Sequence, residues 1–301
     1  MIKQILTDLL ERLWVNYCER VEYARRYRDL VTQKGGRVVN DHIAFRTFNT
    51  KTGELPPGIE AIARLITPLG YEAKGSYEFP DKHLTARHYE HEDPLMPKIF
   101  ISQLEVDRLP ADAQRIINES VADARNLLDT DTQAILRYPQ TMLENNGVDV
   151  VDRLYQFITQ RPWSPPKRDD VLAVNKVSQY AAWTLLHGNS VNHFTAYINE
   201  QQVPEWPDIE KTVEGLKAAG IPMKPDIEGA PGSKLRQTAT QAVDEDCDVR
   251  EADGSIGKLR WSYAYYELAE RNDIPGPDGK PTRFQGFLGA QATHLFEMTK
   301  R

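Results

Sequence analysis

The chain has 301 residues, 40% of them hydrophobic and 27% charged, which is typical of globular proteins and excludes collagen, coiled coil and a disordered chain. Its 37 basic and 44 acidic residues give a formal net charge of −7, and they provide no electrostatic footprint for nucleic acid or an anionic membrane. We therefore expect neither a nucleic-acid partner nor a membrane partner.

The cysteines and the N-terminal segment both favour a cytoplasmic protein. Cys18 and Cys247 are too few and too far apart for a disulfide framework or a zinc knuckle, so a reducing compartment is expected. The first apolar stripe contains Asp8, Glu11 and Arg12, which is typical neither of a signal peptide nor of a membrane span. The sequence therefore predicts a cytoplasmic location.

Residues 1–36 are predicted to form helices that pack on a sheet. Leu9, Leu13 and Val21 belong to an apolar stripe at helical spacing, which indicates an amphipathic helix over residues 2–30 with room for one break. The expected role of this stripe is to cover one face of the sheet.

Residues 37–109 show the pattern of a β-α-β-β-β module. A predicted strand precedes Pro56 and Pro57, and the helix that opens after these prolines ends at Gly70. Three segments rich in aromatic or β-branched residues follow, and each is predicted to be a strand: YEAKGSYEF, KHLTARHYEHE and PKIFISQLEV.

Residues 110–188 differ from their neighbours because their apolar residues follow the helical period of about 3.6 residues. We predict a helical insert here. Its helices are expected in the segments ADAQRIINESVADARNLL, TDTQAILRYPQTMLENN, VDVVDRLYQFITQ and VLAVNKVSQYAAWTLLHG.

Residues 189–301 repeat the first pattern and add a C-terminal extension. The strand VNHFTAYIN and a helix that ends at Gly220 precede three predicted strands, MKPDIEG, LRQTATQAVDEDCDV and GKLRWSYAYYELAER. Gly70 lies 28 residues after His42, and Gly220 lies 27 residues after His193, which favours a duplication. The predicted fold class is α+β, with two β-α-β-β-β modules whose open sheets bury each other.

Each module has a histidine in its first predicted strand. Side chains alternate along a strand, so His42 shares a face with Arg46, and His193 shares a face with Thr195 and Tyr197. If the two sheets face each other, the imidazoles converge, and neutral imidazoles suit zinc, iron, copper or nickel. The alternative is that each histidine is a hydrogen-bonded structural residue.

A third ligand is needed, and the last strand of each module offers a carboxylate. Trp261, Tyr263, Tyr265 and Glu267 share one face in the second module, and Glu105 is the counterpart in the first. Two histidines and one carboxylate leave open positions at a metal, as in non-haem Fe(II) enzymes that bind substrate and oxygen. The alternatives are an aromatic row in the core and a solvated Glu267.

Arg46 is a candidate for binding a substrate carboxylate. Four residues of a strand span ~13 Å, so a guanidinium that reaches back toward a metal at His42 would leave a gap the size of a small acid. The planar fork of arginine pairs with a carboxylate in bidentate fashion, which favours a short dicarboxylate. The alternative is a surface salt bridge.

The remaining motifs indicate no further site. Alternation places His83 and His91 on one face and His88 on the other, which disfavours a joint metal site. All three are expected to be solvated strand residues. The sequence has no G-x-S-x-G, H-E-x-x-H, C-x-x-C or G-x-G-x-x-G motif, so serine hydrolase, zincin, thioredoxin and Rossmann interpretations have no support.

Four segments resemble the 2-oxoadipate dioxygenase/decarboxylase family, also called hydroxyglutarate synthase. They are VNDHIAFRTF, GNSVNHFTAYIN, YAYYELAER and GFLGAQATHLFEMTKR, and they occur in the order of the family. The resemblance implies a fold related to the vicinal-oxygen-chelate superfamily, in which paired β-α-β-β-β modules form a shared curved sheet. The chain is shorter than the longer members of the family, which leaves the identity of the substrate open.

The resemblance also implies a site. It makes His42, His193 and Glu267 the ligands of an Fe(II) cofactor, with Glu267 favoured over Glu105, and it makes Arg46 the residue that holds a substrate carboxylate. The residues expected to line the substrate pocket are Tyr197, Trp261, Tyr263, Tyr265, Phe287 and Leu288.

The activity implied by the resemblance is that of a non-haem Fe(II) dioxygenase and decarboxylase, whose partners are a 2-oxo acid and O2. The best candidate reaction converts 2-oxoadipate to 2-hydroxyglutarate and CO2 in lysine breakdown. Two alternatives stay open. One is a glyoxalase-like lyase or isomerase in which zinc or nickel polarises a carbonyl. The other is a non-catalytic protein that binds a small acid.

Overall fold

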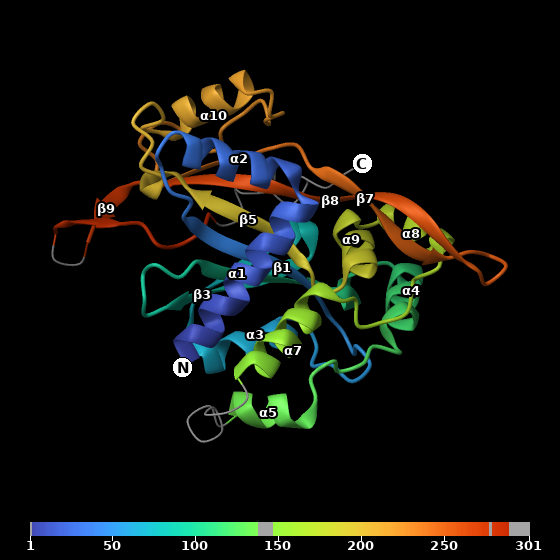
Figure 1. Ribbon diagram of the computed structural model, residues 1–301. Helices are drawn as coiled ribbons and strands as arrows, with labels where there is room; N and C mark the ends of the chain where they lie inside the picture. The colour runs from blue at the N-terminus through green and yellow to red at the C-terminus, as the bar shows by residue number, and fades with distance from the viewer. Residues whose placement is uncertain (1, 138–146, 277–278, 289–301) are drawn as a thin grey trace.

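Two β-α-β-β-β units share one curled sheet, and helices cover it, so the architecture is α+β as predicted (Figure 1). The protein is represented by a computed structural model that describes residues 2–137, 147–276 and 279–288. Within these ranges, the sheet has eight strands.

The first unit has the predicted order of elements. It consists of β1 (Asn40–Asn49), α3 (Glu60–Ile66), β2 (Tyr71–Phe79), β3 (Leu84–His91) and β4 (Lys98–Glu105). Gly70 ends the helical segment with a φ of 99°, a left-handed conformation that residues with a Cβ rarely adopt. β1 is buried along nearly its whole length, as expected for a strand in the middle of a covered sheet.

The second unit repeats this order. It consists of β5 (Val191–Tyr197), α10 (Ile209–Ala218), β6 (Leu235–Ala239), β7 (Val243–Arg250) and β8 (Ile256–Arg271). The carboxylate of Asp208 caps α10 by accepting the backbone N–H of Lys211 at 2.7 Å.

Two strand predictions in the second unit are wrong. MKPDIEG forms only isolated bridges, through Met223 and Glu228, because Pro222 and Pro225 have no N–H to donate to a ladder. Residues 235–249, predicted as one strand, form two strands that pair with opposite ends of β8.

The strand order brings the first strands of the two units together at the centre of the sheet. The order is β2-β3-β4-β1-β5-β8-β6, and β7 also pairs with β8. β1 runs parallel to β4 and antiparallel to β5, and β5 runs parallel to β8. Each unit thus contributes a central parallel pair, and the antiparallel β1–β5 pairing forms the seam between the units.

The seam contains two β-bulges, one in each strand. Asp41, immediately before His42, is an extra residue in β1, and Asn192, immediately before His193, is an extra residue in β5. A bulge turns the side chain of the extra residue away from its regular direction, and bulges are common beside active sites. Both bulges therefore concern residues next to the candidate histidines.

The N-terminal helices α1 (Ile2–Arg20) and α2 (Glu22–Gln33) lie on one face of the sheet (Figure 1). Trp14 and Tyr17 contact Phe194 of β5, with ring centroids 5.2 and 5.0 Å apart. The Tyr17 hydroxyl also donates to the carbonyl of Tyr265 in β8. Tyr17 and Phe194 are buried, and burial of such a ring contributes about 1.5–3 kcal/mol. Helix α1 therefore supports the seam on the face opposite His193.

Five helices lie in the described part of the region predicted as a helical insert. They are α4 (Ala111–Val121), α5 (Thr130–Arg137), α7 (Gly147–Thr159), α8 (Arg168–Asn175) and α9 (Gln179–His187). Helix α9 packs against β1, β7 and β8. The predicted helical residues 138–146 lie outside the described residues, and the division of the chain at residues 36, 109 and 188 stays a prediction.

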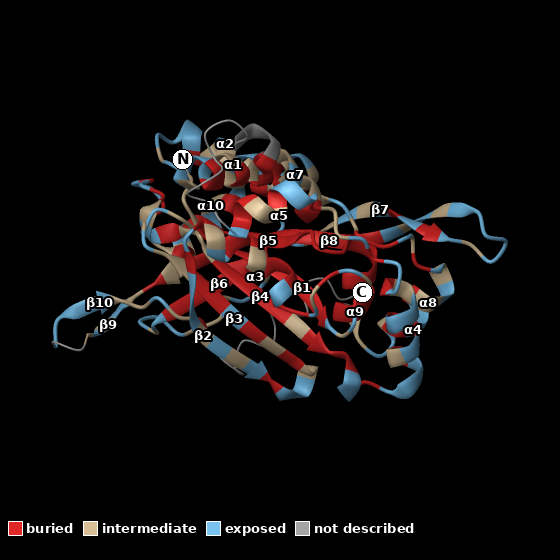
Figure 2. Cartoon of the chain, turned by 90° about the horizontal axis from the view of Figure 1, so that it is seen from below, coloured by how far each residue is buried: buried red, intermediate tan, exposed pale blue. Residues whose placement is uncertain are grey.

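The short elements complete the chain. They are β9 (Asp273–Pro275), β10 (Pro281–Arg283) and the 3-10 helices η1 (Thr67–Leu69), η2 (Pro80–Lys82), η3 (Val106–Arg108) and η4 (Ile198–Glu200). Buried residues concentrate in the sheet, whereas β9 and β10 are largely exposed (Figure 2).

Among the described residues, we find no helix with the length and apolar character needed to cross a bilayer. The two cysteines are free and buried, and a cytoplasmic location stays a prediction.

Candidate metal centre

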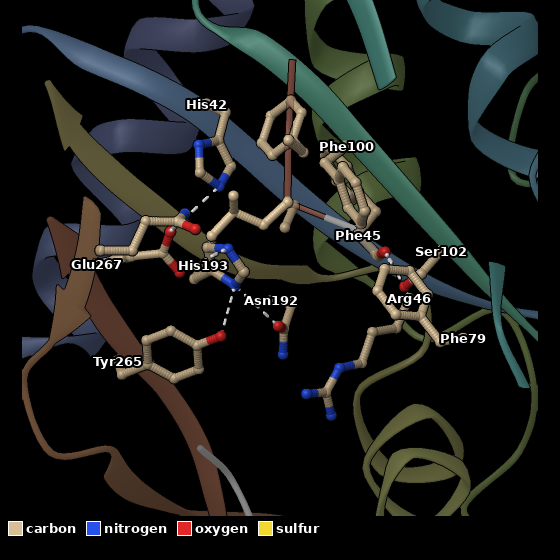
Figure 3. A pocket seen from close by; sticks show the side chains of 14 residues that line it. His42, Phe45, Arg46, Phe79, Phe100, Ser102, Asn192, His193, Tyr265 and Glu267 are labelled. Atoms are coloured by element: carbon tan, nitrogen blue, oxygen red, sulfur yellow. Dashed lines mark hydrogen bonds and ion pairs between the residues drawn. The ribbon is translucent and has the colours of Figure 1, made fainter. Parts of the chain in front are cut away.

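His42, His193 and Glu267 lie together although they are far apart in the sequence (Figure 3). The register of three adjacent strands explains this. His42 of β1 pairs with Thr195 of β5, and Thr195 pairs on its other side with Glu267 of β8. His193 precedes Thr195 by two residues and therefore points to the same face.

The Nε2 atoms of both histidines face the Glu267 carboxylate. Nε2 of His42 lies 3.6 Å from Oε1, and Nε2 of His193 lies 3.5 Å from Oε2. One ligand atom from each of the three residues lies within 4.8 Å of the others. The side chains of His42 and Glu267 are buried, with Glu267 0% exposed, and the His193 side chain is 11% exposed. One cation placed between them would therefore contact all three.

The charge states in this cluster fit a bound cation. Burial lowers the pKa of both histidines, so both imidazoles are neutral at neutral pH. Burial, followed by the charges of Glu228 and Asp41, raises the pKa of Glu267 well above its ordinary value. Within the described part of the chain, Oε2 of Glu267 has no hydrogen-bond partner. Such an atom is costly when buried, and a divalent cation would remove that cost.

The other ring nitrogen of each histidine is held by the residue that precedes it. Nδ1 of His42 lies 2.8 Å from Oδ1 of Asp41, and Nδ1 of His193 lies 3.0 Å from Oδ1 of Asn192. The Tyr265 hydroxyl also lies 2.9 Å from Nδ1 of His193. An acceptor at Nδ1 keeps the proton there and leaves Nε2 available to a metal. The two bulges of the seam thus orient both candidate ligands.

A buried ion pair supports this arrangement on the side of His42. Arg271, at the end of β8, donates to both carboxylate oxygens of Asp41. Burial alone would raise the pKa of Asp41, but the adjacent guanidinium lowers it below its ordinary value. Arg271 also donates to the carbonyls of Phe284 and Gly286, at 3.2 and 2.7 Å. It therefore ties the segment 284–288 to the candidate centre.

The three candidate ligands line a pocket (Figure 3). Of the predicted pocket residues, Arg46, Tyr265, Phe287 and Leu288 also line it. The remaining lining residues are Ala44, Phe45, Phe79, Phe100, Ser102, Asn192 and Gln237. The pocket thus combines the polar cluster with a mainly aromatic wall.

Three predicted pocket residues lie elsewhere. Trp261 packs in a separate apolar cluster with Cys247, Tyr263 donates its hydroxyl to the carbonyl of Val191, and Tyr197 lines a different groove. Alternation places Trp261 and Tyr263 on the face of Glu267, but β8 has 16 residues, and four to six residues span about 13–20 Å. Trp261 and Tyr263 therefore share a face with Glu267 but lie too far along β8 to reach the pocket.

Arg46 is a buried pocket residue, which contradicts the alternative of a surface salt bridge. It is 2% exposed, and its guanidinium carbon lies 5.0 Å from the ring centroid of Tyr180 and 5.1 Å from that of Trp183. Both rings belong to α9, and aromatic faces attract a cation. The helical insert thus provides the platform on which this guanidinium lies.

The prediction that His88 is solvated is wrong. It is 4% exposed, with Nδ1 2.9 Å from the Tyr77 hydroxyl and Nε2 2.9 Å from Oε1 of Glu90. The Tyr77 hydroxyl accepts the backbone N–H of Phe287 at 3.1 Å. The segment 284–288 therefore contacts this part of β2 and β3, which the local strand pattern did not indicate.

Glu105, the counterpart of Glu267, lies outside the pocket. Its carboxylate accepts hydrogen bonds from Asn49, Thr85 and Gln103. These three donors lower its pKa although burial opposes them. The structure therefore places Glu267, and not Glu105, beside the two histidines.

A second group of metal-ligating side chains, His187, Glu245 and Cys247, has a different charge balance. Arg20 donates to both oxygens of Glu245, at 2.7 and 3.1 Å, so the guanidinium already neutralises the charge of this carboxylate. Burial raises the pKa of Cys247 to about 12, whereas a metal ligand must be a thiolate. This group is therefore a poorer fit for a metal.

Sequence reasoning did not single out Asp41, Asn192, Ser102 or Gln237. Asp41 and Asn192 carried a signal, since each is a polar residue directly before a histidine near the start of a predicted strand. Ser102 and Gln237 carried none, because long-range strand pairing brings them to the pocket.

Solved structures share this fold. A protein of Ralstonia eutropha JMP134, provisionally assigned to the glyoxalase superfamily, matches with a TM-score of 0.84 and 25% identity over 95% of this chain and 86% of its own. Hydroxyglutarate synthase of Oryza sativa, solved in complex with 2-oxoadipate, matches with a TM-score of 0.74 and 24% identity over 99% of this chain and 91% of its own. The chain thus has the vicinal-oxygen-chelate fold of the glyoxalase superfamily.

The sequence also places the chain within a family. The family described as 2-oxoadipate dioxygenase/decarboxylase matches residues 14–297. A rice protein named 2-oxoadipate dioxygenase/decarboxylase, chloroplastic/amyloplastic, is 27% identical over 305 residues, which cover 94% of this chain and 75% of the rice protein. The chain belongs to the 2-oxoadipate dioxygenase/decarboxylase family, which confirms the resemblance of its four sequence segments.

Proposed function

We propose that this chain is a non-haem Fe(II) dioxygenase that decarboxylates a 2-oxo dicarboxylic acid. The best candidate substrate is 2-oxoadipate, which with O2 would give 2-hydroxyglutarate and CO2, a step of lysine breakdown. One observation carries the proposal. A buried group of His42, His193 and Glu267 shares its pocket with the buried Arg46, in a chain of this family.

His42, His193 and Glu267 would hold the metal. Two imidazoles and one carboxylate leave positions open for a substrate and for oxygen. Fe(II) bound there would supply the activation of O2 and the polarisation of the substrate carbonyl. Zinc would fit the same ligands, so the oxidative chemistry named for the relatives, rather than the ligand set, favours iron.

The other pocket residues would bind and orient the acid. Arg46 would hold the carboxylate remote from the ligands through paired N–H donors. The rings of Phe79, Phe100 and Phe287 would exclude water from the carbon chain of the substrate. Asp41 would keep a proton at Nδ1 of His42, so that this histidine presents Nε2 to the metal.

The proposed reaction balances without a further reductant. The bond between C1 and the keto carbon breaks, and C1 leaves as CO2. One oxygen atom of O2 enters the new carboxylate at the former keto carbon, and the other becomes the hydroxyl on the neighbouring carbon. The carbon chain of the substrate therefore supplies all the electrons that reduce O2.

Oxygen uptake tests the proposal. Purified protein reconstituted with Fe(II) should bind about one iron per chain, consume one O2 for each 2-oxoadipate and release one CO2, with 2-hydroxyglutarate detected by mass spectrometry. The His193→Ala variant should lose most of its iron and its oxygen uptake, because one of three ligands is missing.

Other outcomes would support the alternatives. Conversion of the acid without oxygen uptake or CO2 release would favour a glyoxalase-like lyase or isomerase and contradict the proposal. Binding of the acid by a protein that retains no metal would favour a non-catalytic role for the histidines.

A further inference from the structure

Asn192 is an amide that a bulge directs toward the candidate substrate pocket. As the extra residue of β5, it departs from regular alternation, and its side chain lies beside that of His193 rather than on the face where Phe194 packs against α1. Asn192 is 3% exposed and lines the pocket together with Arg46.

The two ends of this amide face different groups. Oδ1 of Asn192 lies 3.0 Å from Nδ1 of His193. If Nε2 of His193 binds a metal, Nδ1 carries the proton and Oδ1 accepts it, which fixes the orientation of the amide. Nδ2 therefore points away from the imidazole. Across the residues that the structure describes, Nδ2 has no hydrogen-bond partner. Buried polar atoms rarely stay unpaired, so this donor calls for an acceptor from outside the described chain.

Asp41, the bulge residue of the first unit, shows what the corresponding residue of the first unit binds. Asp41 occupies the bulge of β1, with Oδ1 at Nδ1 of His42, and its carboxylate is neutralised by Arg271. Asn192 has the same relation to His193 but presents an amide nitrogen in place of the second oxygen. In the first unit, the second carboxylate oxygen of Asp41 binds the cationic Arg271. In the second unit, the corresponding atom is the Nδ2 donor of Asn192, which requires a hydrogen-bond acceptor.

Arg46 provides a reason for an anionic acceptor to bind there. The Arg46 guanidinium and the Asn192 amide nitrogen both line the pocket, and in the view of Figure 3 they lie on the same side of His193, away from Glu267. A carboxylate held by Arg46 would offer a free oxygen to Nδ2. Both donors would then act on one charged group, which strengthens each hydrogen bond.

We propose that Asn192 is a specificity-determining residue that binds the distal carboxylate of the substrate, the one remote from the metal. Its Oδ1 positions His193, and its Nδ2 donates, together with Arg46, to the carboxylate remote from the metal. This inference rests on the proposed function and deepens it. The substrate class is a 2-oxo acid with a distal carboxylate, and monocarboxylic 2-oxo acids of the same length are discriminated against.

Two acids of equal length test the inference. Dissociation constants of 2-oxoadipate and 2-oxohexanoate, which lacks the distal carboxylate, are measured by calorimetry on Fe(II)-loaded protein without oxygen. The wild-type protein should prefer 2-oxoadipate by roughly 100-fold or more, since two donors meet a charged acceptor. Asn192→Ala removes one donor and should reduce this preference about 10-fold.

Asn192→Asp separates the two roles of the side chain. It keeps the acceptor for His193 and the side-chain volume, but it replaces the N–H donors with a carboxylate oxygen. Its iron content should stay near that of the wild type, while its preference for 2-oxoadipate should disappear, because two carboxylates would face each other.

Asn189→Asp is the matched control. Asn189 is also a buried amide, and its Nδ2 likewise has no partner among the described residues, but it does not line the pocket. This variant should be less stable, yet the ratio of the two dissociation constants should not change. Both dissociation constants are measured on the same preparation, so a lower fraction of folded protein affects them equally and leaves their ratio unchanged.

Each contrary outcome has a distinct meaning. A wild-type preference that survives both substitutions of Asn192 overturns this inference and leaves the proposed function intact. A preference that falls only in variants that lose iron shows that the residue acts through His193 alone, and the donor role is then wrong. Wild-type protein that binds neither acid, or both equally well, overturns the proposed substrate class and this inference together.

Discussion

At the scale of single residues, Glu267 determines the energetics of the candidate centre. It is 0% exposed, and its Oε1 accepts a hydrogen bond from Gln237 at 2.6 Å. Burial of a charge without a counter-charge is unfavourable, and this is why the pKa of Glu267 lies well above its ordinary value. The metal-free fold should therefore be less stable than it would be with a neutral side chain here.

Glu267→Gln should stabilise the metal-free protein while removing its affinity for metal. The raised pKa means that the wild type loses stability as pH rises above about 4.5, the ordinary carboxyl value, until the folded-state pKa is passed. The variant should thus be more stable by about 1–3 kcal/mol at high pH and no more stable below pH 4.5. Urea unfolding across this pH range measures the difference. A variant that is less stable at every pH would contradict the argument.

Arg46→Met should weaken the binding of a dicarboxylic acid without releasing the metal. Methionine fills much of the buried space over Tyr180 and Trp183 but has no charge and no N–H donor. We expect the dissociation constant of 2-oxoadipate to rise about 100-fold and that of 2-oxohexanoate to change less. Calorimetry and iron analysis on the same preparation measure both effects. Loss of iron would mean that Arg46 is a structural support instead.

At the scale of elements, the sequence predicted strands better than it predicted what each strand contacts. Alternation placed His42 with Arg46, and Trp261 with Glu267, on common faces. It failed for Asp41 and Asn192, because a bulge is defined by the pairing with the partner strand, and a polar residue before a histidine does not by itself indicate one. It also failed to exclude Trp261, since the distance from the pocket along β8 depends on tertiary structure.

Arg271→Met should loosen the segment that follows β8. The substitution leaves Asp41 as a buried charge without its partner and removes the donors to the carbonyls of Phe284 and Gly286. We expect a loss of about 3–5 kcal/mol in the free energy of unfolding. Amide hydrogen exchange at residues 284–288 should become faster.

A double variant separates the two effects of Arg271. Asp41→Asn in the Arg271→Met background removes the unpaired charge and should recover much of the lost free energy. Hydrogen exchange at residues 284–288 should stay fast, because the donors to this segment are still missing. Normal exchange in both variants would show that other contacts, such as that of Tyr77 with Phe287, hold the segment.

At the scale of the whole molecule, the metal would join the two units across their seam. His42 belongs to the first unit, whereas His193 and Glu267 belong to the second. The duplication was predictable, because the spacing between histidine and glycine repeats in the sequence. The joining of the two sheets through an antiparallel pair of first strands was not, since strand order depends on contacts between distant segments.

Metal binding should therefore stabilise the entire fold. Fe(II) at 100 times its dissociation constant, without oxygen, should add about 2.7 kcal/mol. With an entropy of unfolding of about 2.1 cal/mol/K per residue, a chain of this size should then show a rise in Tm of roughly 4 °C. Scanning calorimetry should show this rise for the wild type and for His187→Ala, which alters only the second ligand group, but not for His193→Ala. An equal rise in all three proteins would place the metal elsewhere.

The order of strands along the chain also has a consequence for biosynthesis. The candidate ligands come from residues 42, 193 and 267, so a nascent chain on the ribosome cannot assemble the centre until β8 has emerged. An unfinished or truncated translation product would hold at most two of the three ligands. A metal that needs all three ligands would thus be captured only by protein whose second unit has been synthesised.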